Sequence, residues 1–197
     1  LILQPRVAGG VALRLPDAAA GQSELRFSLP DQFDQLLEVL RALGVRHIHY
    51  QHTLGHSDLV TQLLPERLGV TWDVTVHDFY AACPQISMIW TDGAYCGEEG
   101  PAQCRECLRK NPAPEAVDIV TWRERHASLY LGARHVLAPS RDAAQRMAHY
   151  VPQANYRLVP HPESTANAGD HDLQPPPTPR RVQPDSPLRI AVLGALS

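Results

Sequence analysis

The chain of 197 residues is 44% hydrophobic and 20% charged, and it carries a formal net charge of −3 at neutral pH. These proportions are typical of a globular domain, and the acidic balance argues against nucleic acid as its main partner. No apolar run approaches the roughly 18 residues that a membrane-spanning helix needs. The chain begins at Leu1 without a methionine and ends in what resembles a strand entering a turn, so we expect a fragment of a longer protein.

The first predicted elements are two short strands and a helix. Residues 11–15 and 24–29 have the composition of strands, and a turn with Pro, Asp and Gly separates them. Apolar residues then recur at helical spacing over 33–43, which predicts an amphipathic helix. Asp31 is the predicted cap of this helix, and Gly44 is its predicted end.

A strand and a short helix follow. Residues 45–50 favour a strand whose alternation brings His47 and His49 to one face. A short helix is predicted between Ser57, as its cap, and Gly69, as its end.

The alternation of strands and helices continues to residue 159. The predicted elements are a strand over 70–76 that ends before His77, a helix from Pro114 to Leu131 closed by Gly132, a strand over 135–138, a helix from its cap Ser140 to His149, and a strand over 156–159. This order favours an α/β fold with a mainly parallel sheet and helices on both faces.

Composition divides the chain into three parts. Residues 1–159 form the predicted α/β domain, whereas residues 160–187 contain eight prolines and have the composition of an extended linker. Residues 188–197 begin with an apolar run over 188–193, which Gly194 follows. This pattern predicts the first strand of a second α/β domain that is cut short.

All four cysteines lie in one segment rich in Gly, Asp, Glu and Pro, with the spacing Cys-x12-Cys-x7-Cys-x2-Cys. Four thiolates with one two-residue spacing suit tetrahedral zinc, so we predict a structural zinc site, in a cysteine-rich loop over 83–107, formed by Cys83, Cys96, Cys104 and Cys107. Free thiols and disulfides are the alternatives. A thioredoxin-like redox site is not indicated, because the last two cysteines do not begin a helix after a strand.

Several motifs together resemble one family of glycosyltransferases. Thr75-Val-His-Asp-Phe-Tyr-Ala-Ala-Cys-Pro, Asp92-Gly-Ala-Tyr-Cys-Gly and Cys104-x-x-Cys-Leu are similar to segments of bacterial GT-B glycosyltransferases of the retaining family-four type, which build surface polysaccharides. Weaker segments fit the same family in the same order: 45–56, 135–141 and 188–197. The family's opening strand, its glycine-rich loop and the paired glutamates of its donor domain are not recognisable.

This resemblance implies a Rossmann-like N-terminal domain of a GT-B fold, with the cysteine-rich loop as an insertion. The complete enzyme would transfer a hexose from a nucleotide-diphosphate sugar to a polysaccharide or lipid-linked acceptor with retention, and donor binding would need no metal. The present chain would be the acceptor-side half, inactive without the C-terminal donor-binding domain. The implied location is the cytoplasm, with room for peripheral association at the inner face of the plasma membrane.

The resemblance also implies site residues. His77, at the carboxyl end of a strand, would be the catalytic residue beside the transferred sugar. The implied substrate-binding residues are His52, Gly55, His56, Asp78 and Ser140. From the residues alone, the ring of His77 could instead bond a neighbouring backbone carbonyl, and Asp78 could cap or orient the following loop.

Other hypotheses stay open. The densest histidine cluster is compatible with metal binding, with contact to sugar or acceptor, or with a structural role: His47, His49, His52 and His56. A zinc-stapled module that binds protein or nucleic acid is the rival to the glycosyltransferase, although no basic and aromatic residues interleave with the cysteines. A hydrolase using His77 and Asp78 is a third hypothesis, without a nucleophile elbow or a metal triad beside the pair.

Overall fold

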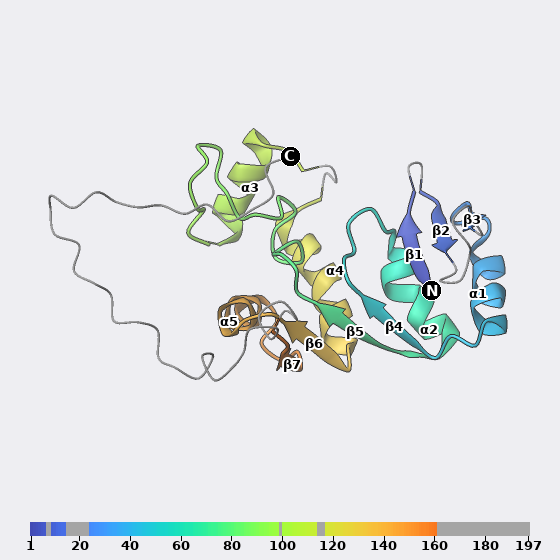
Figure 1. Cartoon of the computed structure of the whole chain (residues 1–197). Helices are drawn as coiled ribbons and strands as arrows, with labels where there is room; N and C mark the ends of the chain where they lie inside the picture. The colour runs from blue at the N-terminus through green and yellow to red at the C-terminus, as the bar shows by residue number, and fades with distance from the viewer. Residues whose placement is uncertain (7–8, 15–23, 99, 114–116, 161–197) are drawn as a thin grey trace, which may run out of the picture. The chain divides into compact units, whose positions relative to one another are not determined.

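The structure is a computed structural model that describes residues 1–6, 9–14, 24–98, 100–113 and 117–160 (Figure 1). The described residues belong to one unit, Leu1–His161. They contain an antiparallel sheet in the order β1-β2-β3 and a parallel sheet in the order β4-β5-β6-β7. The linker and second-domain strand predicted after residue 160 lie outside the described residues.

The antiparallel sheet consists of β1 (Ile2–Pro5), β2 (Val11–Arg14) and β3 (Glu24–Phe27). Strands β2 and β3 confirm the two predicted strands, whereas β1 was not predicted. Strand β1 contains Pro5, which cannot donate a backbone hydrogen bond and is tolerated because β1 lies at the edge of the sheet.

Helix α1 (Phe33–Ala42) covers this sheet and confirms the predicted helix. Its buried residues follow the predicted apolar face: Phe33, Leu36, Leu37 and Leu40. The predicted cap is wrong, because the capping position belongs to Gln32 and no side chain caps the helix. Gly44 follows the helix with a φ of +70°, a backbone conformation that glycine adopts without strain.

The parallel sheet consists of β4 (His47–Tyr50), β5 (Thr71–Thr75), β6 (His135–Ala138) and β7 (Tyr156–Leu158). All four strands confirm the sequence prediction within a residue or two. They are joined by the π-helix η1 (Leu59–Leu63) with α2 (Leu64–Leu68), by α4 (Ile119–Gly132) and by α5 (Arg141–Tyr150). The order of strands in the sheet is their order in the chain, so successive right-handed connections put their helices on the same face.

The helix ends show which of the predicted caps and starts are correct. The Ser140 hydroxyl accepts a hydrogen bond from the amide of Ala143 at 3.1 Å, which confirms the predicted cap of α5. Ser57 does not cap with its side chain; its carbonyl oxygen accepts the amides of Val60 and Thr61. Helix α4 begins at Ile119 rather than at the predicted Pro114, which lies outside the described residues.

The position of Asp118 explains the later start of α4. Its carboxylate accepts a hydrogen bond from the amide of Val120 at 2.9 Å, so Asp118 is the cap that the prediction overlooked. The predicted end is sound, since Gly132 is the last residue of α4.

The two faces of the parallel sheet differ sharply. One face is apolar and packs on α4 and α5 through a buried cluster that includes Tyr50, Val74, Val136, Leu129 and Met147. The other face carries polar side chains, most of them at least partly exposed: His47, His49, Thr71, Asp73, Thr75 and His135. In the part of the chain that the structure describes, helices therefore pack on one face, and the predicted second covered face is not seen.

The cysteine segment is more ordered than the predicted loop. Helix α3 (Pro101–Lys110) carries Cys104 and Cys107, and an isolated β-bridge pairs Ile89 with Tyr95. The prediction of a loop insertion over the whole segment is therefore wrong for its last part, which Pro101 at the first helical position could have signalled.

The segment also joins the rest of the domain. Trp122 of α4 is buried against Tyr80, and its indole nitrogen donates a hydrogen bond to the Tyr80 carbonyl at 2.7 Å. Cys104 and Leu108 pack against the same small cluster. Within the ranges described, no helix combines the length and apolar character required to cross a membrane.

Candidate functional site

The carboxyl ends of β4 and β5 surround a small cavity of about 20 Å³. Three of the predicted site residues line it: His52, His77 and Asp78. Open α/β sheets bind ligands outside the carboxyl ends of their parallel strands, so this is the edge at which a site is expected.

His52 and Asp78 form a closely held pair. The Nε2 atom of His52 lies 2.6 Å from Oδ2 of Asp78, while its Nδ1 atom accepts the amide of Leu54 at 2.9 Å. An Nδ1 that accepts carries no proton, so Nε2 donates to the carboxylate. The other carboxylate oxygen accepts the amide of Tyr80 at 2.9 Å, and the Tyr80 ring lies beside His52. Asp78 thus orients the loop that follows it, which is the alternative role considered for it from the residues alone.

His77 is exposed at the end of β5, and its partner is a side chain. Its Nε2 atom lies 2.7 Å from Oε1 of Gln51, and the Gln51 amide nitrogen lies 3.2 Å from Nδ1 of His49. This orientation of Gln51 makes Nε2 of His77 a donor. Its Nδ1 atom has no hydrogen-bond partner among the described residues. The alternative in which the ring bonds a backbone carbonyl is therefore not what the structure has.

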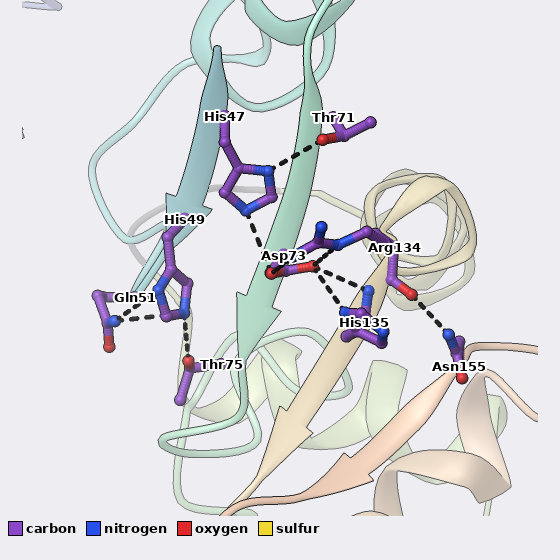
Figure 2. Close-up of polar contacts among 9 residues, drawn as sticks. All are labelled: His47, His49, Gln51, Thr71, Asp73, Thr75, Arg134, His135 and Asn155. Carbon is purple, nitrogen blue, oxygen red and sulfur yellow. Dashed lines mark hydrogen bonds and ion pairs between the residues drawn. The ribbon is translucent and has the colours of Figure 1, made fainter. Parts of the chain in front are cut away.

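The histidines belong to a ladder of polar pairs across β4 and β5, most of which Figure 2 shows. Its three rungs, which we call the polar ladder, are His47–Asp73 at 3.1 Å, His49–Thr75 at 2.7 Å and Gln51–His77 at 2.7 Å. In every rung the partners are 26 residues apart. His47 and His49 each reach the β5 residue two beyond their paired neighbour, and Gln51 and His77 follow just after the two strands. His52–Asp78 has the same separation, so the site continues this regular arrangement.

Asp73 is the most connected member of the ladder. Its carboxylate accepts the backbone amide of His135 at 3.0 Å and pairs with the Arg134 guanidinium at 3.2 Å and with His47 (Figure 2). Burial alone would raise the pKa of Asp73, but the hydrogen bond and charge of Arg134, aided by His47 and His135, bring it below the usual 3.8. Asp73 therefore remains ionised and holds three strands together.

Two other histidines have altered acidity. Burial lowers the pKa of His49, with Asp73 opposing and the charges of His47 and His77 adding to the shift. Burial and the neighbouring His52 lower the pKa of His56. The Nδ1 atom of His56 is buried without a hydrogen-bond partner in the described structure.

The remaining predicted substrate residues are dispersed. His56 and Gly55 do not line the cavity at the carboxyl edge. Gly55 has a φ of +79°, and a Cβ there would lie 3.2 Å from Pro5, so a turn beside β1 explains this glycine. Ser140 is occupied as the cap of α5.

The sequence analysis did not predict Gln51, although alternation from His47 and His49 places it on the same face. Tyr80 and Tyr130 also line the cavity and were missed, since their contacts depend on how distant segments pack.

The four cysteines converge on a second cavity, which all of them line. All four are free thiols, and burial raises the pKa of Cys83 and of Cys107, with neighbouring thiols adding to the effect. Cys104 receives a hydrogen bond from the Arg123 guanidinium at 3.3 Å. As the side chains stand, the described residues include no group of three or more His, Cys, Asp or Glu that could hold a metal ion. This applies to the histidines of the polar ladder as well.

Comparisons with protein-family models, with curated proteins and with solved structures match this chain to none of them.

Proposed function

We propose that this chain is the acceptor-side half of a retaining GT-B glycosyltransferase that transfers a hexose from a nucleotide-diphosphate sugar to a polysaccharide or lipid-linked acceptor. The motifs around His77 and the cysteines motivate the family. The observation that carries the proposal is the polar constellation of His52, His77 and Asp78 at the carboxyl edge of the parallel sheet. The described domain has a parallel sheet flanked by helices, and this Rossmann-like architecture is compatible with that family.

His77 has the chemistry for contact with a sugar. With Nε2 held by Gln51, the Nδ1 atom is left as a hydrogen-bond acceptor at an exposed strand end. A sugar hydroxyl is a matching donor. We infer that His77 orients the transferred hexose beside the departing phosphate, and that the His52–Asp78 pair fixes the loop below it.

The proposal also covers where the donor binds and where the protein acts. The donor would be held chiefly by a C-terminal domain, so residues 1–197 alone would show no transferase activity. Because donor and acceptor must be fixed against each other, losing one half removes about 7–11 kcal/mol of barrier lowering available from proximity. The protein would act in the cytoplasm, free or peripherally at the inner face of the plasma membrane.

The test uses the protein that the complete gene encodes, with a panel of nucleoside-diphosphate hexoses and release of nucleoside diphosphate as the signal. We expect His77→Ala to lower kcat on the order of 100-fold with a smaller change in KM, because its hydrogen bond strengthens in the transition state. His149→Ala, at an exposed position on α5, is the matched control and should retain wild-type rates.

Gln51→Ala should produce a smaller loss of kcat than His77→Ala, because Gln51 orients the ring without touching the sugar. Circular dichroism melts separate these effects from misfolding. Wild-type rates for His77→Ala would refute its role, and the absence of transfer with every donor would refute the proposed activity.

A further inference from the structure

The cavity between the cysteines is small and almost wholly apolar apart from its thiols. Its other walls include Met88, Ile89, Trp90, Leu108 and Ile119. Its volume is about 20 Å³. A site needs at least about 10–15 Å³ by the same kind of measure to hold one water molecule. The cavity, which all four cysteines line, thus has room for a single small ion or water molecule.

The backbone around this cavity is strained. In the described part of the chain, three residues other than glycine have a positive φ: Ile86 at 66°, Met88 at 54° and Glu98 at 56°. All three lie between Cys83 and Cys104. Such conformations cost on the order of 1–3 kcal/mol each and persist only where the surroundings impose them. A bond network that ties the cysteines together would supply this restraint.

The thiols are presented as metal ligands commonly are. Cys104 and Cys107 are three residues apart on α3, which brings both sulfurs to one side of the helix.

Arg123 of α4 contacts Cys104 and is held in place by further bonds. Its Nη2 atom lies 3.3 Å from Sγ of Cys104, and its Nε donates to the Ala82 carbonyl at 2.9 Å. The guanidinium lies over the Tyr150 ring, 4.6 Å from the centroid. No carboxylate among the described residues forms an ion pair with Arg123, so this partly buried cation has a thiol where an anion would be expected.

We propose that Cys83, Cys96, Cys104 and Cys107 bind one structural zinc ion, and that Arg123 supplies the positive charge that stabilises the site. Zinc with four thiolates carries a net charge of −2, which is costly in an apolar environment unless a cation is nearby. Because the described side chains do not form a metal site as they stand, the proposal requires the four cysteines to reorient around the cavity that they share. The inference is independent of the proposed glycosyltransferase activity.

The test measures metal directly on the purified chain. Elemental analysis should find about one zinc per chain, and Co²⁺ substituted for zinc should give the absorption of tetrahedral thiolate coordination. Competition with a chelator gives the affinity. Cys107→Ser should lower it by at least about 100-fold, and Arg123→Met by about 10–100-fold, the usual range for residues outside the ligand shell. Arg123→Lys should recover part of the loss.

Arg125→Met is the matched control, since Arg125 lies on the same helix and pairs with Asp58 but does not line the cysteine cavity. Its zinc affinity should equal that of the wild type. Far-ultraviolet circular dichroism establishes that each variant is folded before its affinity is compared. If a variant does not fold, its affinity is not compared. The site is then tested by whether zinc protects the thiols of the wild-type chain from alkylation.

Two results would overturn the metal site, and a third would overturn the role of Arg123. Absence of zinc with four freely alkylated thiols in the folded wild type would eliminate the metal site. Iron with inorganic sulfide would replace the single ion by a cluster. Zinc binding unchanged in Arg123→Met would refute the role of Arg123 while leaving the four ligands in place.

Discussion

The two faces of the parallel sheet hold the same strands together by different means. On one face, apolar side chains such as Val74 and Val136 are buried beneath α4 and α5. On the other, the polar ladder binds β4 to β5 through side chains that hydrogen-bond one another. Parallel sheets are usually covered on both faces. The described structure shows how a face can remain in contact with water if its side chains satisfy each other.

The comparison also explains where the candidate site lies. The ladder repeats one geometry along β4 and β5, and the His52–Asp78 pair repeats the separation beyond the strands. Within the strands, the residues of the apolar face are occupied by packing. The polar face therefore fixes the register and delivers His77 to the site.

The apolar face should tolerate truncation least. Met147 is fully buried beneath the sheet, and Met147→Ala should lower the free energy of unfolding by about 2–5 kcal/mol, through lost burial and the cavity left behind. Leu131→Ala is the matched control, since Leu131 is half exposed on α4 and should cost far less. Urea denaturation measures both variants. Equal losses would show that burial does not distinguish the two positions.

Asp73→Asn should break the polar face at its most connected residue. Losing the charge weakens the bonds from Arg134 and His47, so we expect a loss of about 1–3 kcal/mol in unfolding free energy. Asp142→Asn, in an exposed pair with Arg146, should change little.

The pH dependence of the Asp73 contribution follows from its lowered pKa. It should be complete above the ordinary value of 3.8 and disappear as pH falls through the folded value. If the wild type and Asp73→Asn lost the same free energy of unfolding as pH falls through this range, the assignment to Asp73 would be wrong.

Two histidines should also make the free energy of unfolding depend on pH. The pKa of His49 and that of His56 are both below the usual 6.5, chiefly because of burial, so the unfolded chain takes up protons first. The free energy of unfolding should therefore rise with pH up to about 6.5 and fall as the solution becomes more acidic. Combining His49→Gln with His56→Gln should reduce the stability difference between about pH 7.5 and about pH 5.5. An unchanged difference would assign the effect to other groups.

Thr75→Val should have the smallest effect. It removes the hydroxyl that contacts His49 but keeps a β-branched side chain suited to a strand. We expect a loss of about 1 kcal/mol or less in unfolding free energy. A much larger loss in urea denaturation would mean that the ladder acts as a cooperative network rather than as separate pairs.

The local patterns predicted most elements because the information was local. Apolar spacing located α1, and β-favouring runs between turn residues located all four parallel strands. Helix ends were less predictable, since Asp31 and Ser57 are suitable caps by composition but not by geometry. Strand β1 was missed because an edge strand containing Pro5 lacks the usual signal.

The candidate site was only partly predictable. Strand ends identified His77 and Asp78, and alternation could have identified Gln51. The contact of Arg123 with Cys104 joins residues on different helices and depends on packing that no spacing reveals. The same holds for Tyr80, whose backbone meets both Asp78 and Trp122.

Trp122 gives the protein an internal optical reporter. Its indole donates to the carbonyl of Tyr80, the residue whose amide is held by Asp78, while the next residue in the chain is Arg123, against the cysteine cavity. We therefore expect an event at either place to alter the surroundings of one buried fluorophore. Emission recorded in a protein whose other tryptophans, Trp72 and Trp90, are replaced by phenylalanine would let ligand binding and metal binding be followed in real time without an attached dye.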